Sequence, residues 1–320
     1  MSRPKRFSLR SSGRPRGAPV PAKPPRRIRA RVRALRERFL FNREMRLRLM
    51  SAAVLIPIVI TTAYLGGIPF LLLALIIGAA VFYEWLAMVG AGGMLGPRLT
   101  GWAALAGIAV LAHMSPLPVA LAAVAIACGV TAAVGTLQKS FISLRWLAAG
   151  MLYSGLAVVS LVALRKGADG FGAVIFVFLI AWASDTMAFF VGRKVGGPKL
   201  WPSVSPSKTW SGAVGGFVAA IVFGAVVGNM LGVPFAAGTL IAAGLVAIGA
   251  QSGDLIESAA KRRFSIKDAG TLIPGHGGVM DRVDGLIVSA LISVLMGSIV
   301  AFWVSAATPA AGLLHMMGMG

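Results

Sequence analysis

The sequence predicts an all-α, polytopic membrane protein with about nine transmembrane helices. Of its 320 residues, 57% are hydrophobic and only 13% are charged, which is far too apolar for an ordinary soluble domain. Apolar runs of about 17 to 25 residues recur along the chain, and runs of that length cross the hydrocarbon core as helices. The chain is also rich in glycine, with 40 residues, and small residues are typical of contacts between membrane helices.

The expected spans follow from the apolar runs. They cover residues 49–65, 68–90, 101–114, 117–137, 146–164, 171–192, 211–232, 235–256 and 283–305. The third run is shorter than the roughly 20 residues that a spanning helix needs. It therefore leaves three alternatives open: a differently tilted helix, a re-entrant segment, or a merger with its neighbour.

The chain before the first run is strongly basic. Residues 1–48 hold seventeen Lys or Arg and no apolar core, so we expect the first span to remain as an anchor rather than be cleaved. Residues 1–26 are expected to be disordered, and the segment after them to lie as an amphipathic helix on anionic lipid headgroups. The tail lacks the aromatic interleaving of a single-strand binder, so we expect no nucleic-acid partner; a docking arm is the weaker alternative.

The remaining charges predict the orientation. Fourteen Lys or Arg follow Arg48, and with the tail inside only Arg165 and Lys166 fall on the outer side. This distribution satisfies the positive-inside rule and places residues 193–210 and 257–282 in the cytoplasm. We therefore expect a multi-pass protein of the inner (cytoplasmic) membrane whose active site faces the cytoplasm.

The stretch SVSPSKTWSG, residues 203–212, has the groups that a polyphosphate needs. Ser205, Lys208 and Thr209 offer hydroxyl donors and a positive charge, and Pro206 blocks a regular helix. A positive-inside anchor would explain the lysine equally well. Downstream, the glycine-rich PGHGG turn allows a close approach to phosphate, and its His276 is a candidate base or phosphate donor, or an ordinary loop histidine.

Carboxylates inside apolar runs are costly and by default indicate function. Asp254 ends the eighth run, and Asp281 and Asp284 open the ninth. Their three-residue spacing places Asp281 and Asp284 on one helix face, where Asp254 can meet them. Oxygen-only ligands predict a hard cation, Mg²⁺, whereas salt bridges to nearby Lys and Arg are the alternative.

Two further acids lie within apolar runs. Asp185 is expected to bind metal, to orient Lys208 or to satisfy a helix contact, and its burial favours function. Glu84 lies between Tyr83 and Trp85, so an interfacial position would explain all three side chains without a site.

The segment SAAKRRFSIKDAGTLIPGHGGVMDRVD, residues 258–284, resembles the C-terminal signature of the phosphatidate cytidylyltransferases, or CDP-diacylglycerol synthases. GDL at 253–255, SDTMAFFVGRKVGG and SPSKTW also resemble family blocks, in the family order. The sequence departs from the family pattern in Ala260, in Ser211 where Glu is common, and in Gly285. The loss of Glu at position 211 makes a metal role there doubtful.

The resemblance implies an enzyme that joins phosphatidate and CTP to give CDP-diacylglycerol and pyrophosphate, in a fold that forms a homodimer. It implies Asp254 and Asp281 as Mg²⁺ ligands, Asp284 as a weaker one, and room for a second, monovalent ion such as K⁺. Lys208 and Lys267 are the catalytic cations expected beside these acids. The remaining expected substrate contacts are Ser205, Thr209, Lys261, Arg262, His276, Arg282 and Asp185.

The chain is thus expected to have four parts. Residues 1–48 are the basic tail, 49–165 the N-terminal transmembrane helices, 166–305 the catalytic transmembrane region and 306–320 a C-terminal tail. Two other functions remain open. An ion-coupled transporter also uses intramembrane acids and glycine-broken helices, and a CTP-dependent polyprenol or phytol kinase would transfer the terminal phosphate instead.

Overall fold

The computed structural model describes residues 47, 49–137, 144–230, 237–273, 275 and 277–318. Eight described helices are long and apolar enough to cross a membrane, and a shorter apolar helix covers Leu49–Leu65. The eight are α2 (Gly67–Met88), α3 (Leu95–Met114), α4 (Leu117–Leu137), α5 (Leu144–Arg165), α6 (Gly170–Val195), α7 (Trp210–Met230), α8 (Ala237–Arg263) and α9 (Met280–Val304). The all-α, polytopic prediction is confirmed.

The third span is complete. Helix α3 begins at Leu95, six residues before the predicted start, and has 20 residues. Pro97 lies in its first turn, where the missing N–H costs nothing, and the Arg98 guanidinium lies 5.7 Å from the centre of the Trp102 ring. Because α3 and α4 (Leu117–Leu137) are separate helices, the merged alternative is wrong, and α3 is long enough to cross the membrane.

A short antiparallel hairpin follows α6. Its strands are β1 (Lys199–Trp201) and β2 (Ser205–Thr209), which pair Lys199 with Thr209 and Trp201 with Ser205. The sequence indicated a non-helical segment here but not a hairpin. Helix α7 begins at once after β2 because the Thr209 hydroxyl accepts a hydrogen bond from the Gly212 N–H, at 3.1 Å, as an N-cap.

A tenth helix lies in the segment that was predicted as a C-terminal tail. Helix α10 covers Pro309–Met317, and the Thr308 side chain caps it by accepting from the Ala311 N–H. Thr followed by Pro, with Gly318 at the far end, is a readable start and stop signal for a helix. The sequence analysis did not predict a helix in this segment, and the division into four parts stays a prediction.

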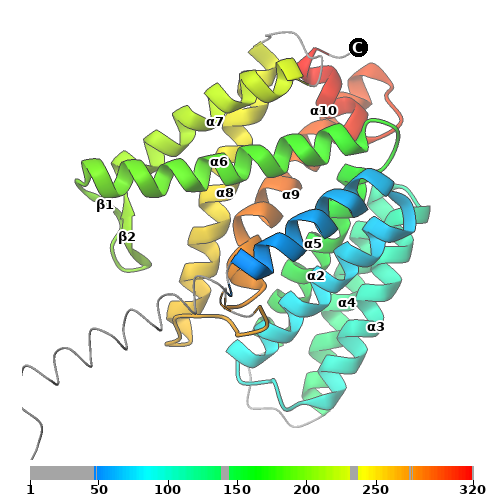
Figure 1. The fold of residues 1–320 in the computed structure, drawn as a ribbon. Helices are drawn as coiled ribbons and strands as arrows, with labels where there is room; N and C mark the ends of the chain where they lie inside the picture. The colour runs from blue at the N-terminus through cyan, green and yellow to red at the C-terminus, as the bar shows by residue number, and fades with distance from the viewer. Residues whose placement is uncertain are drawn as a thin grey trace, which may run out of the picture. The chain divides into compact units, whose positions relative to one another are not determined.

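The helices pack in two neighbourhoods (Figure 1). Helices α3, α4 and α5 pack against one another and α2 packs against α3 and α5, while α6 packs along α7, and α8 packs along α9 and α10. Glycines allow the closest approaches: a Cβ added to Gly216 would lie 2.7 Å from the Ser184 carbonyl, and one added to Gly249 would lie 2.8 Å from the Ser289 Cα. The division at residues 165 and 166 stays a prediction, and most of the tail 1–48 lies outside the described residues.

Two cations hold the end of the helices opposite to the candidate site. Arg165 donates to the Ala63 carbonyl at 2.5 Å and to the Tyr64 carbonyl at 3.0 Å, at the end of the first helix. Lys166 donates to the Ser115 carbonyl, just after α3, at 2.9 Å. These are the two residues that the positive-inside analysis placed on the outer side, and both bind carbonyls that the helix ends leave unpaired.

Candidate active site

Three carboxylates meet where α8 and α9 lie side by side. Asp254 and Glu257 come from α8 and Asp284 from the first turns of α9, and their oxygens lie within 4.8 Å of one another. Glu257 and Asp284 are buried, with 2% and 7% of their surface exposed. We call Asp254, Glu257 and Asp284 the acid cluster.

The acid cluster has the chemistry of a cation site. The Glu257 Oε1 and Asp284 Oδ2 atoms are buried and have no hydrogen-bond partner among the residues that the structure describes. Three carboxylates this close repel one another strongly away from water, and two unpaired buried oxygens add the cost of lost hydration. A hard cation bound by oxygen ligands would remove both costs, so the residues fit such an ion.

Glu257 was not among the predicted site residues. It follows Asp254 by three residues, the spacing that puts two side chains on one face of a helix, so the signal was present in the sequence. The basic run that follows it, starting at Lys261, pointed instead to an ordinary salt bridge.

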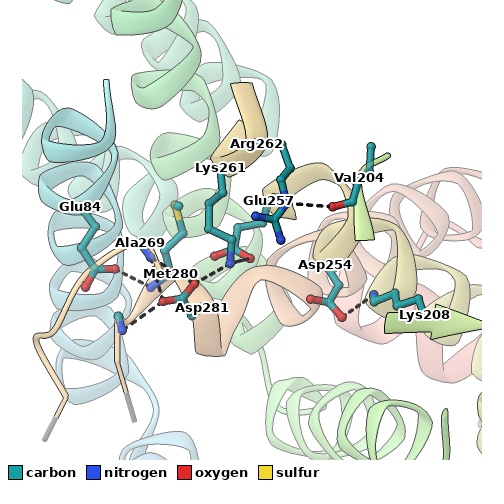
Figure 2. A network of polar contacts seen from close by, with 11 residues as sticks. Glu84, Val204, Lys208, Asp254, Glu257, Lys261, Arg262, Ala269, Met280 and Asp281 are labelled. Atoms are coloured by element: carbon teal, nitrogen blue, oxygen red, sulfur yellow. Dashed lines mark hydrogen bonds and ion pairs between the residues drawn. The ribbon is translucent and has the colours of Figure 1, made fainter. Parts of the chain in front are cut away.

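Asp281 lies in a different environment from the acid cluster (Figure 2). Its Oδ1 is 2.7 Å from the Lys261 Nζ, and its Oδ2 accepts from the backbone N–H groups of Ala269 and Gly278, both at 3.1 Å. The carboxylate thus fastens the loop between α8 and α9. The structure brings Asp284, rather than Asp281, together with Asp254, and a metal role for Asp281 stays a prediction.

Lys261 lies between the acid cluster and Asp281. Its ammonium lies 2.7 Å from the Glu257 Oε2 and 2.7 Å from the Asp281 Oδ1, and its side chain is only 13% exposed. The predicted substrate contact is therefore occupied by two carboxylates. It balances part of the negative charge that the two helices bring together.

A cavity of about 640 Å³ lies beside the acid cluster, between α6, the hairpin and α8. Asp185, Arg193, Lys199 and Lys208 line it together with Asp254. The Lys208 ammonium is ion-paired with the Asp254 carboxylate, and both side chains are partly exposed. Asp254 therefore belongs to both the cavity wall and the acid cluster.

The other predicted residues are more dispersed. Ser205 is buried in β2, and the Thr209 hydroxyl, which reaches the cavity, is engaged as the α7 cap. Arg262 donates to the Val204 carbonyl at 3.4 Å, which ties α8 to the hairpin. Lys267 and Arg282 are exposed, on the loop and on the first turn of α9. His276 lies outside the described residues.

Glu84 is a further functional candidate near the site. Its side chain is buried in the protein, with only 1% of its surface exposed. Its Oε1 accepts from the Val279 N–H at 2.9 Å and its Oε2 from the Met280 N–H at 2.7 Å. A residue of α2 thus contacts the start of α9 beside the site.

Comparisons with known proteins identify the family of this chain. A model of the cytidylyltransferase family matches residues 46–300, which is most of the chain. The phosphatidate cytidylyltransferase of Brucella abortus is 41% identical over 257 residues, which cover 79% of this chain and 93% of the relative. That of Bacillus subtilis is 30% identical over 257 residues, covering 76% and 94%. These matches confirm the resemblance found in the sequence, and the chain belongs to the cytidylyltransferase family.

Proposed function

We propose that the chain is a phosphatidate cytidylyltransferase, which transfers CMP from CTP to phosphatidate and releases pyrophosphate. Beyond the family membership, one observation carries the proposal. A buried acid cluster is joined, through Asp254, to a cavity lined by Arg193, Lys199 and Lys208. Such a site suits two phosphate-bearing substrates and a cation, one beside the other.

The reaction needs positioning more than proton transfer. A phosphate oxygen of phosphatidate forms a bond to the α-phosphorus of CTP, and the bond from that phosphorus to the oxygen bridging to the β-phosphate breaks. The leaving group is pyrophosphate, and the product is CDP-diacylglycerol. The attacking phosphate is already ionised near neutral pH, so the step requires no general base.

The cations of the cavity offset the charge of the phosphates. Arg193 and Lys199 lie on its wall without a carboxylate partner among the described ion pairs, whereas Lys208 is paired with Asp254. Lysine and arginine donors at such positions hold phosphate oxygens and stabilise the charge that develops on the leaving group. Asp185 lines the same cavity, where a carboxylate would attract these cations.

We propose Mg²⁺ as the cation of the acid cluster, held by Asp254, Glu257 and Asp284. When bound, Mg²⁺ would offset negative charge on the phosphate oxygens of the reactants. Its preference for carboxylate ligands matches the donor set, which has no nitrogen or sulfur. Asp281 as a ligand, and a second, monovalent ion such as K⁺, remain predictions from the resemblance.

We also propose that the site faces the cytoplasm. Twelve of the fourteen Lys and Arg after Arg48 fall on the side of the hairpin and the α8–α9 loop when the tail is placed inside. That side supplies CTP, while phosphatidate arrives from the adjacent leaflet. The homodimer stays a prediction, which chemical crosslinking in the native membrane would test.

The function is tested with the purified chain in detergent, supplied with phosphatidate, Mg²⁺ and CTP labelled at either the α or the γ phosphate. We expect α label to appear in the lipid and γ label to appear in pyrophosphate. Asp254→Asn should abolish the transfer, while the matched control Asp169→Asn, an exposed acid at the other end of the helices, should retain it.

Each other outcome contradicts the proposal in a different way. Transfer of γ label to an added polyprenol would identify a kinase. The absence of any transfer with fully folded protein would favour the transporter. Full activity of Asp254→Asn would exclude the acid cluster as the reacting site.

A further inference from the structure

We propose that Glu84 is a positioning residue for the reaction: from α2, it caps the start of α9 and so fixes the direction of the carboxylates that α9 brings to the site. The inference rests on the proposed function. Glu84 does not touch the cavity, so its effect would be transmitted through the backbone of Val279 and Met280.

Helix α9 begins without a cap of its own. The residue before it, Val279, has no side chain able to accept a hydrogen bond, and the first N–H groups of a helix have no partner within it. Glu84, on another helix, accepts from the Val279 N–H at 2.9 Å and from the Met280 N–H at 2.7 Å. Figure 2 shows the contact with Met280. Its negative charge also complements the positive end of the α9 dipole.

The cap belongs to a continuous row of contacts. Three successive N–H groups, those of Gly278, Val279 and Met280, each donate to a carboxylate: the first to Asp281 and the other two to Glu84. The chain therefore enters α9 with every one of these donors satisfied. No ion pair described for this structure involves Glu84, so its charge is balanced by the amides and the helix end.

Two glycines of the α8–α9 loop leave space for the Glu84 carboxylate. A Cβ added to Gly270 would clash with the Glu84 Oε1, and one added to Gly278 would lie 2.9 Å from the Glu84 Oε2 and 2.8 Å from the Asp281 Oδ2. The loop thus leaves space for a carboxylate at this position from two sides. Burying an acid is costly, and here the two backbone donors of Val279 and Met280 offset part of that cost.

The position of the cap on α9 explains how Glu84 can affect the acid cluster. Asp281 and Asp284 lie in the first two turns of α9, one and four residues after Met280. If the start of α9 shifts or frays, Asp284 moves relative to Asp254 and Glu257. The acid cluster then holds a cation less well, although none of its members has changed.

The test measures divalent-cation affinity directly, by the loss of free Mn²⁺ signal in electron paramagnetic resonance, with the full chain in detergent. Glu84→Gln keeps the length of the side chain but only one oxygen acceptor, and Glu84→Ala removes both. We expect Mn²⁺ affinity to fall about tenfold for Gln and further for Ala. The Mg²⁺ concentration for half-maximal CMP transfer should rise in parallel, with the KM for CTP at saturating Mg²⁺ nearly unchanged.

The control is Phe82→Leu, on the same helix. Phe82 is fully buried, and its ring packs against Gly101 of α3. It should lower the thermal unfolding midpoint while leaving Mn²⁺ affinity as in the parent. If the Glu84 variants lose stability but keep the Mn²⁺ affinity of the parent, Glu84 is only structural and the inference is overturned.

The two proposals fail separately. Mn²⁺ binding that depends on Glu84, in a chain that transfers no CMP, would support the positioning role and contradict the proposed function. CMP transfer that is independent of Glu84 would support the proposed function and contradict the positioning role. A parent chain that binds no Mn²⁺ would overturn the positioning role.

Discussion

At the scale of single residues, Asp281 and Asp284 show that two acids on the same helix face can have different roles. Both open α9, three residues apart. Asp281 has donors on both oxygens, whereas the Asp284 Oδ2 is buried and has no donor in the described part of the chain. Satisfied carboxylates stabilise a fold, and unsatisfied ones need a ligand.

The two aspartates should therefore respond differently to the same substitution. Asp284→Asn removes a charge from the acid cluster, so the Mg²⁺ concentration for half-maximal activity should rise about tenfold or more. Its thermal unfolding midpoint without Mg²⁺ should hold or rise, because like charges no longer repel. Asp281→Asn should instead lower that midpoint, since a lost charged acceptor costs about 1.5–3 kcal/mol.

Thermal unfolding in detergent and Mg²⁺ titration of activity measure the two effects side by side. The opposite pattern, with Asp281→Asn stable but cation-deficient, would assign the metal to Asp281 as the family resemblance implies. Glu257→Gln should follow Asp284→Asn in cation dependence, because both residues belong to the acid cluster.

At the scale of helices, glycines set how closely α8 and α9 approach. A Cβ added to Gly253 would overlap the backbone of Asp284 and lie 2.8 Å from the Gly285 Cα. Gly253 directly precedes Asp254, so this contact sets the separation of two members of the acid cluster. Backbone atoms cannot rotate away as a side chain can, and the helices themselves must move.

Gly253→Ala should consequently weaken both packing and cation binding. We expect a loss of about 1–3 kcal/mol of stability and a rise in the Mg²⁺ requirement, measured by thermal unfolding and by titration of CMP transfer. Gly129→Ala on α4 is the matched control, because an added Cβ there meets nothing within 4 Å. That control should leave the Mg²⁺ requirement unchanged; an unchanged requirement in Gly253→Ala as well would mean that the helix contact does not set the site.

At the scale of the whole described chain, the loops fall into two groups at opposite ends of the helices. The hairpin, the α8–α9 loop and the end of α2 meet at one end, through Arg262 with Val204 and Glu84 with Met280. Arg165 and Lys166 meet carbonyls at the other end. The contacts agree with the alternation of loops that the charge count predicts.

Cysteine labelling tests the proposed sidedness. In a Cys128→Ala background, Asp169→Cys should react with a membrane-impermeant maleimide in intact cells, and Asp268→Cys only after permeabilisation. Both positions are exposed, so access to the reagent decides the result. Labelling of Asp268→Cys in intact cells would place the site on the outer side.

Sequence reasoning predicted the spans well, because hydropathy is a local property that the bilayer reads directly. It also located the chemistry, since acids in apolar runs are rare and costly. It missed the hairpin and α10, although Thr308 and Pro309 carried a local signal for the latter. A short polar or terminal segment gives little periodicity to read.

The individual contacts of the site could not be predicted from the sequence for a different reason. Glu84 lies 195 and 196 positions before its two partners in the sequence, so no local spacing pattern predicts these contacts. Asp281 and Asp284 have different partners because the α8–α9 loop folds so that its Ala269 N–H reaches the Asp281 carboxylate. Only the three-dimensional arrangement decides which carboxylate meets an amide and which meets another acid.

The carbonyls bound by Arg165 have a consequence for the order in which the chain is made. The first helix ends near Tyr64, but its cap is synthesised about a hundred residues later, because the Arg165 and Ala63 partners are 102 positions apart. The first five helices can therefore close as one unit only when α5 has left the ribosome. Glu84 then stays without its partners until α9 emerges, so nascent chains arrested before residue 279 would hold a buried acid that has nothing to bind.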